Sequence, residues 1–220
     1  MLNIIERLDK DRFAPAVCVS KLGGKLDDAV REMGIPLIEA EFTLPAKPYR
    51  SLLSRARKAA HVFKPYEIDL WHSFHYAGEY TEPIIAHFSG AKAWVYTKKN
   101  MSWGDRSWYL RSFLAKRIAV QNTDMVRDFF DNPLFRGKVR LIPRGVDAEK
   151  LNPKVKPSMN LREALHIPKD SALVGCVAHL VPVKGHPTLI EATSKIPAAH
   201  LLLAGKHLDA DYKNQLDQQI

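Results

Sequence analysis

The 220-residue chain has few cysteines and no long apolar run. Its two cysteines, Cys18 and Cys176, are far apart and fit no metal-binding spacing, which excludes a disulfide framework and a zinc module. No apolar stretch reaches the ~18 residues that a membrane-spanning helix needs. The charged start, MLNIIERLDKDRF, is unlike the apolar core of a secretory signal. These shortages favour a cytoplasmic globular protein.

The overall composition is ordinary, with 46% hydrophobic and 26% charged residues. Such values exclude a disordered chain, a collagen-like chain and a coiled coil. Because domains commonly contain about 100–200 residues, the length fits one large domain or two small ones.

The net charge of +9 is concentrated in two stretches. Residues 47–64 contain six basic and no acidic side chains, and residues 92–140 contain eleven basic and four acidic ones. An excess of this kind suits an anionic partner such as a phosphate, a nucleotide or an anionic membrane surface. Two solvated helix faces would explain it equally well.

Helical and strand patterns alternate along the chain. This alternation predicts an α/β fold with parallel sheets. Two continuous apolar runs, at residues 173–178 and 200–204, are typical of strands buried on both faces. The charged, proline-bearing stretch 147–157 is the best linker, so we expect domains at residues 1–150 and 151–220. The predicted strands are residues 14–19, 35–38, 68–72, 93–97, 118–121, 139–142, 173–178 and 200–204, and the main predicted helices are residues 27–33, 51–63, 79–88, 107–115, 123–130, 161–165 and 188–194.

The segment VGCVAHLVPVKGHPTLIEA, residues 174–192, is the most informative one. A predicted strand ends at Ala178, a loop holds His179 and Lys184, and Gly185 precedes a helix. Ligands of parallel sheets bind at the carboxyl ends of the strands, and a helix N-terminus attracts anions. The pattern therefore indicates a phosphate or diphosphate site. A merely solvated loop lysine is the alternative.

Four segments together resemble family 4 of the retaining glycosyltransferases. They are IPRGVD (142–147), VAHLVPVKGHPTLIEA (177–192), IDLWHSFH (68–75) and KAWVYTKKN (92–100). The resemblance implies the GT-B architecture, in which two Rossmann-like domains face a cleft. It identifies residues 1–150 as the acceptor-side domain without its first strand, and residues 151–220 as the start of the nucleotide-sugar domain.

The resemblance implies transfer of a sugar from a nucleotide diphosphate sugar, with retention and no obligatory metal or other cofactor. The expected acceptor is a glycan, a lipid-linked intermediate or a polysaccharide. Lys184 matches the family lysine that binds the donor diphosphate, with Gly185 beside it. His179 falls where the family has arginine, and histidine, with an ordinary pKa near ~6.5, is only partly charged at neutral pH.

Other positions also depart from the family pattern. Lys99 falls on the family histidine near the transferred sugar, so it is the catalytic candidate, although it can equally bind an anion or be solvated. Arg144 replaces the usual asparagine, and Gly145 is expected in a tight turn. His72, His75 and Asn100 follow strand ends and are acceptor-side or cleft candidates, with packing roles as the alternative. Trp103 can stack on a sugar face.

Two further expectations concern activity. The family's glycine-rich turn would lie before Met1 and its pair of acidic donor ligands after Ile220, so we expect weak or no transfer by this chain. The alternative to an enzyme is therefore a nucleotide-sugar-binding fragment or pseudoenzyme.

The partners follow from charge and motif. The basic helix at residues 51–64 can contact anionic lipid headgroups at the inner face of a membrane. No helix-turn-helix, zinc or aromatic RNA-binding signature supports a nucleic-acid partner.

Overall fold

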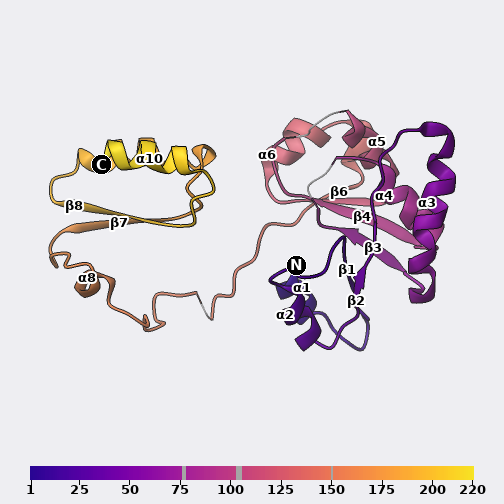
Figure 1. The fold of residues 1–220 in the computed structure, drawn as a ribbon, viewed down its shortest axis with the longest axis horizontal. Coiled ribbons are helices and arrows are strands. Elements are labelled where there is room, and N and C mark those ends of the chain that lie inside the picture. The colour runs from indigo at the N-terminus through magenta and orange to yellow at the C-terminus, as the bar shows by residue number, and fades with distance from the viewer. Residues whose placement is uncertain (76–77, 103–105, 150) are drawn as a thin grey trace. The chain divides into compact units, whose positions relative to one another are not determined.

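The computed structural model describes residues 1–75, 78–102, 106–149 and 151–220. The chain divides into two compact units, Met1–Gly145 and Val146–Ile220, which are treated separately below. Figure 1 shows the elements of both units as a ribbon. Among the described residues, no helix combines the length and the apolarity needed to cross a bilayer.

Unit 1 contains two parallel sheets. The first pairs β1 (Val17–Val19) with β2 (Leu37–Glu39). The second has the order β3-β4-β5-β6, formed by Leu70–Ser73, Ala93–Lys98, Arg117–Val120 and Val139–Leu141. In its register Lys98 pairs with Val120, and Val120 with Leu141. All four strands therefore end at one common edge.

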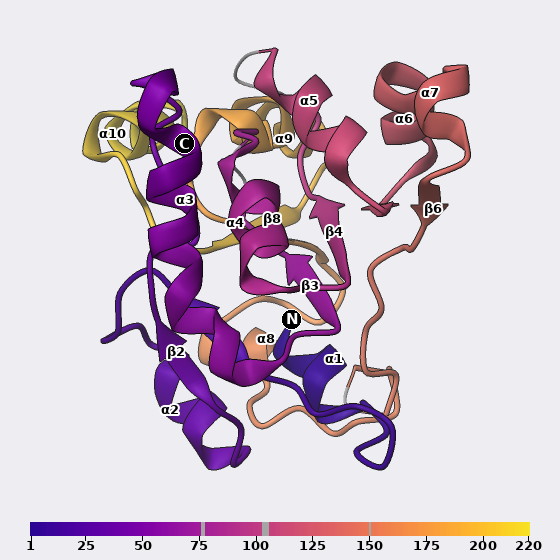
Figure 2. The ribbon, with the colours of Figure 1, turned by 90° about the vertical axis from the view of Figure 1, so that its right-hand side faces the viewer.

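Helices cover this sheet because each connection between parallel strands must cross back over it. Figure 2 shows α4 between α3 and the strands β3 and β4. The shared core contains Phe63, Trp71, Ile85, Ile118 and Phe130, all buried. The helical segments of unit 1 are α1 (Leu2–Glu6), α2 (Asp27–Glu32), η1 (Tyr49–Ser51), α3 (Leu52–Ala60), η2 (His61–Tyr66), α4 (Thr81–Ser89), α5 (Ser107–Leu114), α6 (Thr123–Met125), η3 (Val126–Phe130) and α7 (Pro133–Arg136).

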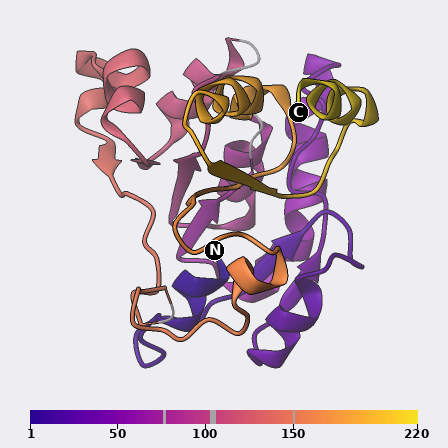
Figure 3. The same ribbon diagram turned by 90° about the vertical axis from the view of Figure 1, so that its left-hand side faces the viewer.

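Unit 2 is built on one pair of parallel strands, β7 (Ala172–Val177) and β8 (Ala199–Ala204). Figure 3 shows α9 (His186–Ser194) and α10 (Ala210–Gln219) over one face of that pair. Leu201 and Leu203 pack on this side against Ile190, Tyr212 and Leu216. The short segments α8 (Leu161–Ala164) and η4 (Pro182–Lys184) complete the unit.

The expectation that β7 and β8 are buried on both faces is wrong. The β7 residues alternate between partly buried and exposed, and Val177 is 89% exposed. The physical reason is that both long helices of unit 2 lie on one side of the strand pair, which leaves the other side open. A continuous apolar run does not reveal how many faces are covered.

Two predicted helix limits also need correction. The helix expected at residues 51–63 continues as the 3-10 segment η2, which includes Pro65 and ends at Tyr66. The helix expected to run to Phe130 changes after Met125 into the π-type segment η3. Its N-cap is Asn122, whose Oδ1 accepts a hydrogen bond from the Met125 amide at 2.8 Å. This cap satisfies one of the amides that helices leave unpaired.

Candidate functional site

The carboxyl edge of the β3–β6 sheet brings together most of the site residues predicted in unit 1. His72 lies at the end of β3, Lys99 and Asn100 follow β4, and Arg144 follows β6. Parallel strands place these positions at one edge because their chain directions agree. Trp103 lies outside the described residues.

His72 is held by the neighbouring strand. Its Nε2 lies 2.8 Å from Thr97 Oγ1, and its ring packs on Phe74 with 4.0 Å between centroids. His72 as a whole is exposed, but the atoms around its ring displace enough water to lower the pKa of the imidazole to about 4. His72 is therefore neutral at physiological pH, when it can donate or accept one hydrogen bond at this edge.

Lys98, the last residue of β4, is a structural residue. It is only 3% exposed, and its Nζ donates to Asn100 O at 2.5 Å and to Ser102 O at 3.0 Å. Burial lowers its pKa to about 8. The Asn100 side-chain oxygen also faces this amine, at 3.3 Å. Asn100 therefore shapes the loop after β4.

Lys99 and Arg144 place two positive charges near the end of β5. Arg144 Nε donates to Gln121 Oε1 at 3.0 Å, and Gln121 directly follows β5. The Lys99 amine lies 5.8 Å from the centre of the Phe74 ring. Burial, together with the charge of Arg144, lowers the pKa of Lys99. Both departures from the family pattern thus add a cation to the same edge.

Gly145 does not occupy the tight turn expected for it. It lies in an irregular segment, is absent from the glycines with positive φ, and has no atom within 4 Å of the position that a Cβ would take. No turn or close approach requires a glycine there. The sequence pattern alone had suggested the turn.

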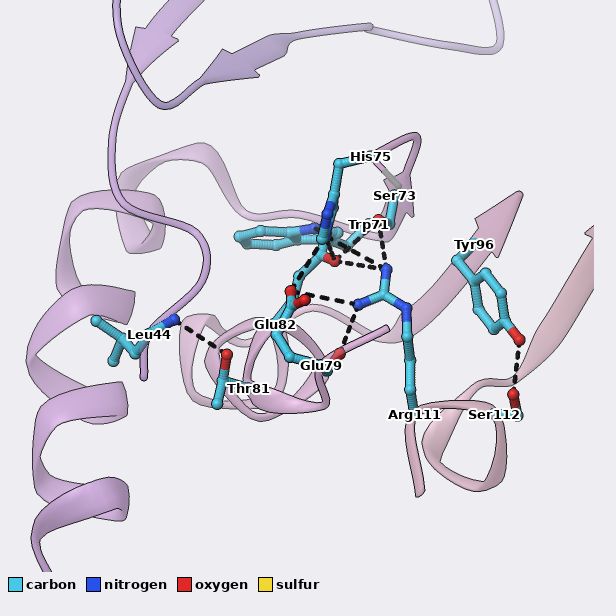
Figure 4. A network of polar contacts seen from close by, with 10 residues as sticks. All are labelled: Leu44, Trp71, Ser73, His75, Glu79, Thr81, Glu82, Tyr96, Arg111 and Ser112. Atoms are coloured by element: carbon cyan, nitrogen blue, oxygen red, sulfur yellow. Dashed lines mark hydrogen bonds and ion pairs between the residues drawn. The ribbon is translucent and has the colours of Figure 1, made fainter. Parts of the chain in front are cut away.

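His75 belongs to a buried polar cluster that we define as Trp71, Ser73, His75, Glu79, Glu82 and Arg111. Figure 4 shows Glu82 at its centre. Glu82 Oε2 accepts from Ser73 Oγ and from Arg111 Nη2, each at 2.8 Å, and His75 Nε2 lies 2.6 Å away. Glu82 Oε1 accepts from Trp71 Nε1 at 3.0 Å.

The cluster joins β3, α4 and α5, because Ser73, Glu82 and Arg111 come from these three elements. Burial alone would raise the pKa of Glu82, but the His75 hydrogen bond and the Arg111 charge outweigh it and lower the pKa. The Arg111 guanidinium also lies over the Trp94 ring at 4.7 Å. The contact with Glu82 thereby fixes the His75 ring, while the His75 side chain remains 22% exposed.

His75, Glu79 and Glu82 offer ligand atoms within 4.8 Å of one another, close enough to hold a metal ion. Arg111 lies within this group, 2.8 Å from Glu82 Oε2 and 3.8 Å from Glu79 Oε1. Its guanidinium already neutralises carboxylate charge and would repel a second cation at this distance. The donor set is therefore that of an internal ion-pair network.

Unit 2 places the other predicted residues, His179, Lys184 and Gly185, in the loop between β7 and α9. Lys184 ends the short segment η4, and Gly185 is the N-cap of α9 with φ of +68°. A left-handed φ of this size is readily adopted only by glycine. His179 and Lys184 are exposed.

The N-terminus of α9 is open to an anion. No side chain caps it, and its first turn contains no acidic residue. Beside it His186 is 1% exposed, with Nδ1 3.5 Å from Tyr212 Oη and no described partner for Nε2. Free amides, a helix dipole and the Lys184 charge coincide there.

Gly205 is a site residue that sequence reasoning missed. It follows β8, and a Cβ at this position would lie 1.8 Å from the Ala178 carbonyl oxygen. The two strand ends are further joined by hydrogen bonds from Ala178 N to Ala204 O and from Leu180 N to Lys206 O, both 3.0 Å. A glycine directly after a predicted strand was the available signal.

Comparison with solved structures shows the fold. A glycosyltransferase from Rickettsia africae ESF-5 matches with a TM-score of 0.76 and 20% identity, over 94% of this chain and 56% of that one. Anabaena Alr3699/HepE, solved in complex with UDP-glucose, matches with a TM-score of 0.66 and 21% identity, over 93% and 57%. MurG of Acinetobacter baumannii matches with a TM-score of 0.55 and 11% identity, over 99% and 58%.

The chain therefore spans little more than half the length of these structures, and their GT-B fold agrees with the parallel α/β architecture described above. No curated protein sequence matches it. The sequence profile of Glycosyltransferase Family 4 matches residues 1–150, more than half of the chain. By that match, the chain belongs to glycosyltransferase family 4.

Proposed function

We propose that this chain serves in the transfer of a sugar, with retention, from a nucleotide diphosphate sugar to a glycan, lipid-linked or polysaccharide acceptor. The observation that carries the proposal is the uncapped N-terminus of α9, with Gly185 in a left-handed conformation and Lys184 next to it. Diphosphates carry the charge and the oxygen acceptors that such a helix end binds.

Three residues of the β7–α9 loop, and Gly205 after β8, have roles in this proposal. Lys184 places its ammonium on the diphosphate and stabilises the charge that grows on it as the sugar leaves. Gly185 lets the backbone approach the phosphates closely. His179 donates one hydrogen bond to them. Gly205 supports the loop because it allows the ends of β7 and β8 to lie against each other.

The acceptor side of the proposal uses the edge of the β3–β6 sheet. His72, His75 and Asn100 border it, together with Lys99, Arg144 and Gly145. Lys99 takes the place of the family's catalytic histidine.

Calorimetric titration of the purified chain with UDP and UDP-glucose tests the donor site. UDP-glucose is the first donor to try because the HepE structure was solved with it. Lys184→Gln should weaken UDP binding about tenfold, the usual value of one charge-assisted hydrogen bond. The control is Lys195→Gln, at the other end of α9, where Lys195 pairs with Glu191. Equal weakening by both variants would count against the proposal.

The alternative function is nucleotide-sugar binding without transfer. Release of UDP from UDP-glucose, with and without a glycan acceptor, separates the two. A transferase releases UDP above the spontaneous rate, and the release falls in Lys99→Gln. Binding in calorimetry without any release indicates the alternative.

We further propose that α3 contacts an anionic membrane surface on the cytoplasmic side. Its exposed residues include Arg50, Arg57, Lys58 and Lys64 in the helix and its two flanking 3-10 turns. Tyr49, Leu53, Val62 and Tyr66 are exposed among them. Basic residues next to exposed apolar ones suit the headgroup region, where each cation contributes about 1 kcal/mol.

Sedimentation with phosphatidylcholine vesicles, with and without phosphatidylglycerol, tests the membrane contact. The triple variant Arg50→Gln, Lys58→Gln, Lys64→Gln should lose the binding to anionic vesicles. The matched control replaces three exposed lysines of unit 2, Lys154, Lys156 and Lys169, by Gln. Equal partitioning into both kinds of vesicle would disprove the contact.

A further inference from the structure

The strand order brings Lys99 and Arg144 to one place. β4 and β6 flank β5, so the two residues approach the end of β5 from opposite sides. Neighbouring strands lie about 4.8 Å apart, and both side chains are long enough to reach across one strand width. In the register, Lys98 pairs with Val120, so Lys99 and Gln121 occupy the next level.

A hydrogen bond fixes the direction of Arg144. Its Nε donates to Gln121 Oε1 at 3.0 Å, so the guanidinium is tied to the residue that directly follows β5. Its terminal nitrogens donate to no described residue. A planar guanidinium held by Nε can present these nitrogens together to an oxyanion.

The two cations are close enough to affect each other. The pKa of Lys99 is lowered by burial and by the charge of Arg144. Their repulsion is a cost in the unliganded protein, and an anion between them would remove it. Neutral His72 and the Phe74 ring border the same place, so a bound group would meet one hydrogen-bonding ring and one aromatic face.

We propose that Lys99 and Arg144 form one oxyanion subsite on unit 1, which binds a phosphate or carboxylate group of the acceptor. The inference rests on the proposed transferase function and defines its acceptor as acidic. Lys99 then serves as an anion ligand. The donor diphosphate belongs to the separate loop around Lys184.

The experiment uses the full 220-residue chain and inorganic phosphate, followed by amide NMR shifts. Saturable shifts are expected at Lys99, Gln121 and Arg144. Lys99→Gln and Arg144→Gln should each weaken phosphate binding about tenfold. The control is Arg117→Gln at the amino end of β5, where the exposed side chain donates to the neighbouring Lys116 carbonyl. Lys99→Arg keeps the charge and should retain most of the binding, whereas Arg144→Lys keeps the charge but loses the planar pair of donors and should weaken the binding.

Competition experiments then identify the source of the oxyanion. Glucose 1-phosphate and glucuronate should displace phosphate, with the stronger competitor identifying phosphate or carboxylate, while neutral glucose should not. Shifts confined to the β7–α9 loop, or variants that bind phosphate like the wild type, would overturn the subsite. UDP binding weakened by Lys99→Gln would instead assign these cations to the donor.

The proposal can fail independently of the proposed function. The donor function depends on whether Lys184→Gln weakens UDP binding, and the subsite depends on whether Lys99→Gln and Arg144→Gln weaken phosphate binding. Suppose that Lys184→Gln weakens UDP binding, but neither Lys99→Gln nor Arg144→Gln weakens phosphate binding. The donor function would then be retained and the oxyanion subsite rejected.

Discussion

Arg111 and Glu82 form a buried ion pair that joins α5 to the start of α4, with Nη2 and Oε2 2.8 Å apart and neither side chain more than 2% exposed. The same guanidinium donates to Ser73 Oγ at 2.7 Å and to the Glu79 carbonyl at 2.8 Å. The pair thus fixes the chain segment that carries His75 at the carboxyl edge of the β3–β6 sheet.

Removing one partner of this pair should be strongly destabilising. Glu82→Gln or Arg111→Met leaves a buried charge without its counter-ion, which costs about 3–5 kcal/mol. Urea unfolding monitored by Trp fluorescence measures this, because all four Trp lie within residues 1–145. The double variant should lose less than the sum of the singles.

The control for that prediction is Asp124→Asn, which breaks the exposed pair between Asp124 and Arg127. Exposed pairs contribute about 1 kcal/mol or less. If the buried and the exposed variants lose similar amounts of stability, the cluster is not a structural element.

Stability should also depend on pH through Glu82. Its pKa is lower in the folded protein than the ordinary value of 4.5, so the unfolded state binds the proton more tightly. The stabilisation is complete above pH 4.5 and is lost as the pH falls through the folded-state pKa. Unfolding free energies from pH 6 to pH 3 should therefore fall more steeply in the wild type than in Glu82→Gln. Parallel curves would contradict the assignment.

Gly205→Ala should disrupt the start of the β7–α9 loop, where Ala178 lies. The added Cβ would lie 1.8 Å from the Ala178 carbonyl oxygen, so one backbone segment must move. Overpacking of this kind costs about 1–3 kcal/mol. Amide hydrogen exchange of β7 and β8 measures the loss. Gly175→Ala is the matched control, since nothing lies within 4 Å of its Cβ position, and its exchange rates should stay near those of the wild type.

Arg144→Gln should raise the pKa of Lys99. The charge of Arg144 is one of the two causes that lower this pKa, and burial, the larger cause, remains in the variant. The shift should therefore be upward yet leave the pKa below the ordinary value of 10.5. NMR titration of the Lys99 side chain checks it, with Arg117→Gln as the reference variant. An unchanged Lys99 pKa would show that the charge of Arg144 does not act on Lys99.

Loss of the Asn122 cap should weaken the segment after β5. Asn122→Ala removes the acceptor of the Met125 amide and should cost about 0.5–2 kcal/mol. Asn122→Asp keeps the acceptor and should retain the stability. Thermal unfolding of the three proteins gives the comparison, and identical midpoints for Ala and Asn would exclude a capping role.

Much of the fold could be predicted from the sequence because its signals are local. The alternation of strands and helices predicted parallel sheets. The positions of His72, Lys99 and Arg144 at one sheet edge followed from their places after predicted strands.

The buried Glu82–Arg111 pair and the contacts of Lys98 in the loop after β4 could not be predicted from local signals. Glu82 and Arg111 are 29 residues apart, and nothing in their neighbours marks them as partners. Lys98 looked like Lys99 in the sequence, although one is buried on carbonyl oxygens and the other lies at the edge. The open face of β7 was missed because hydrophobicity does not state which side is covered.

The packing of unit 2 has a thermodynamic consequence. Its buried hydrophobic side chains among the described residues are Ile190, Tyr212 and Leu216, which is little apolar burial for a segment of this length. A nucleotide that binds at the ends of β7 and β8 would add its binding free energy to the stability of unit 2. At a concentration of 100 times Kd it contributes about 2.7 kcal/mol. Under the proposed function, ligand binding to the β7–α9 loop is therefore coupled to folding, and unit 2 should become resistant to proteolysis when UDP is present.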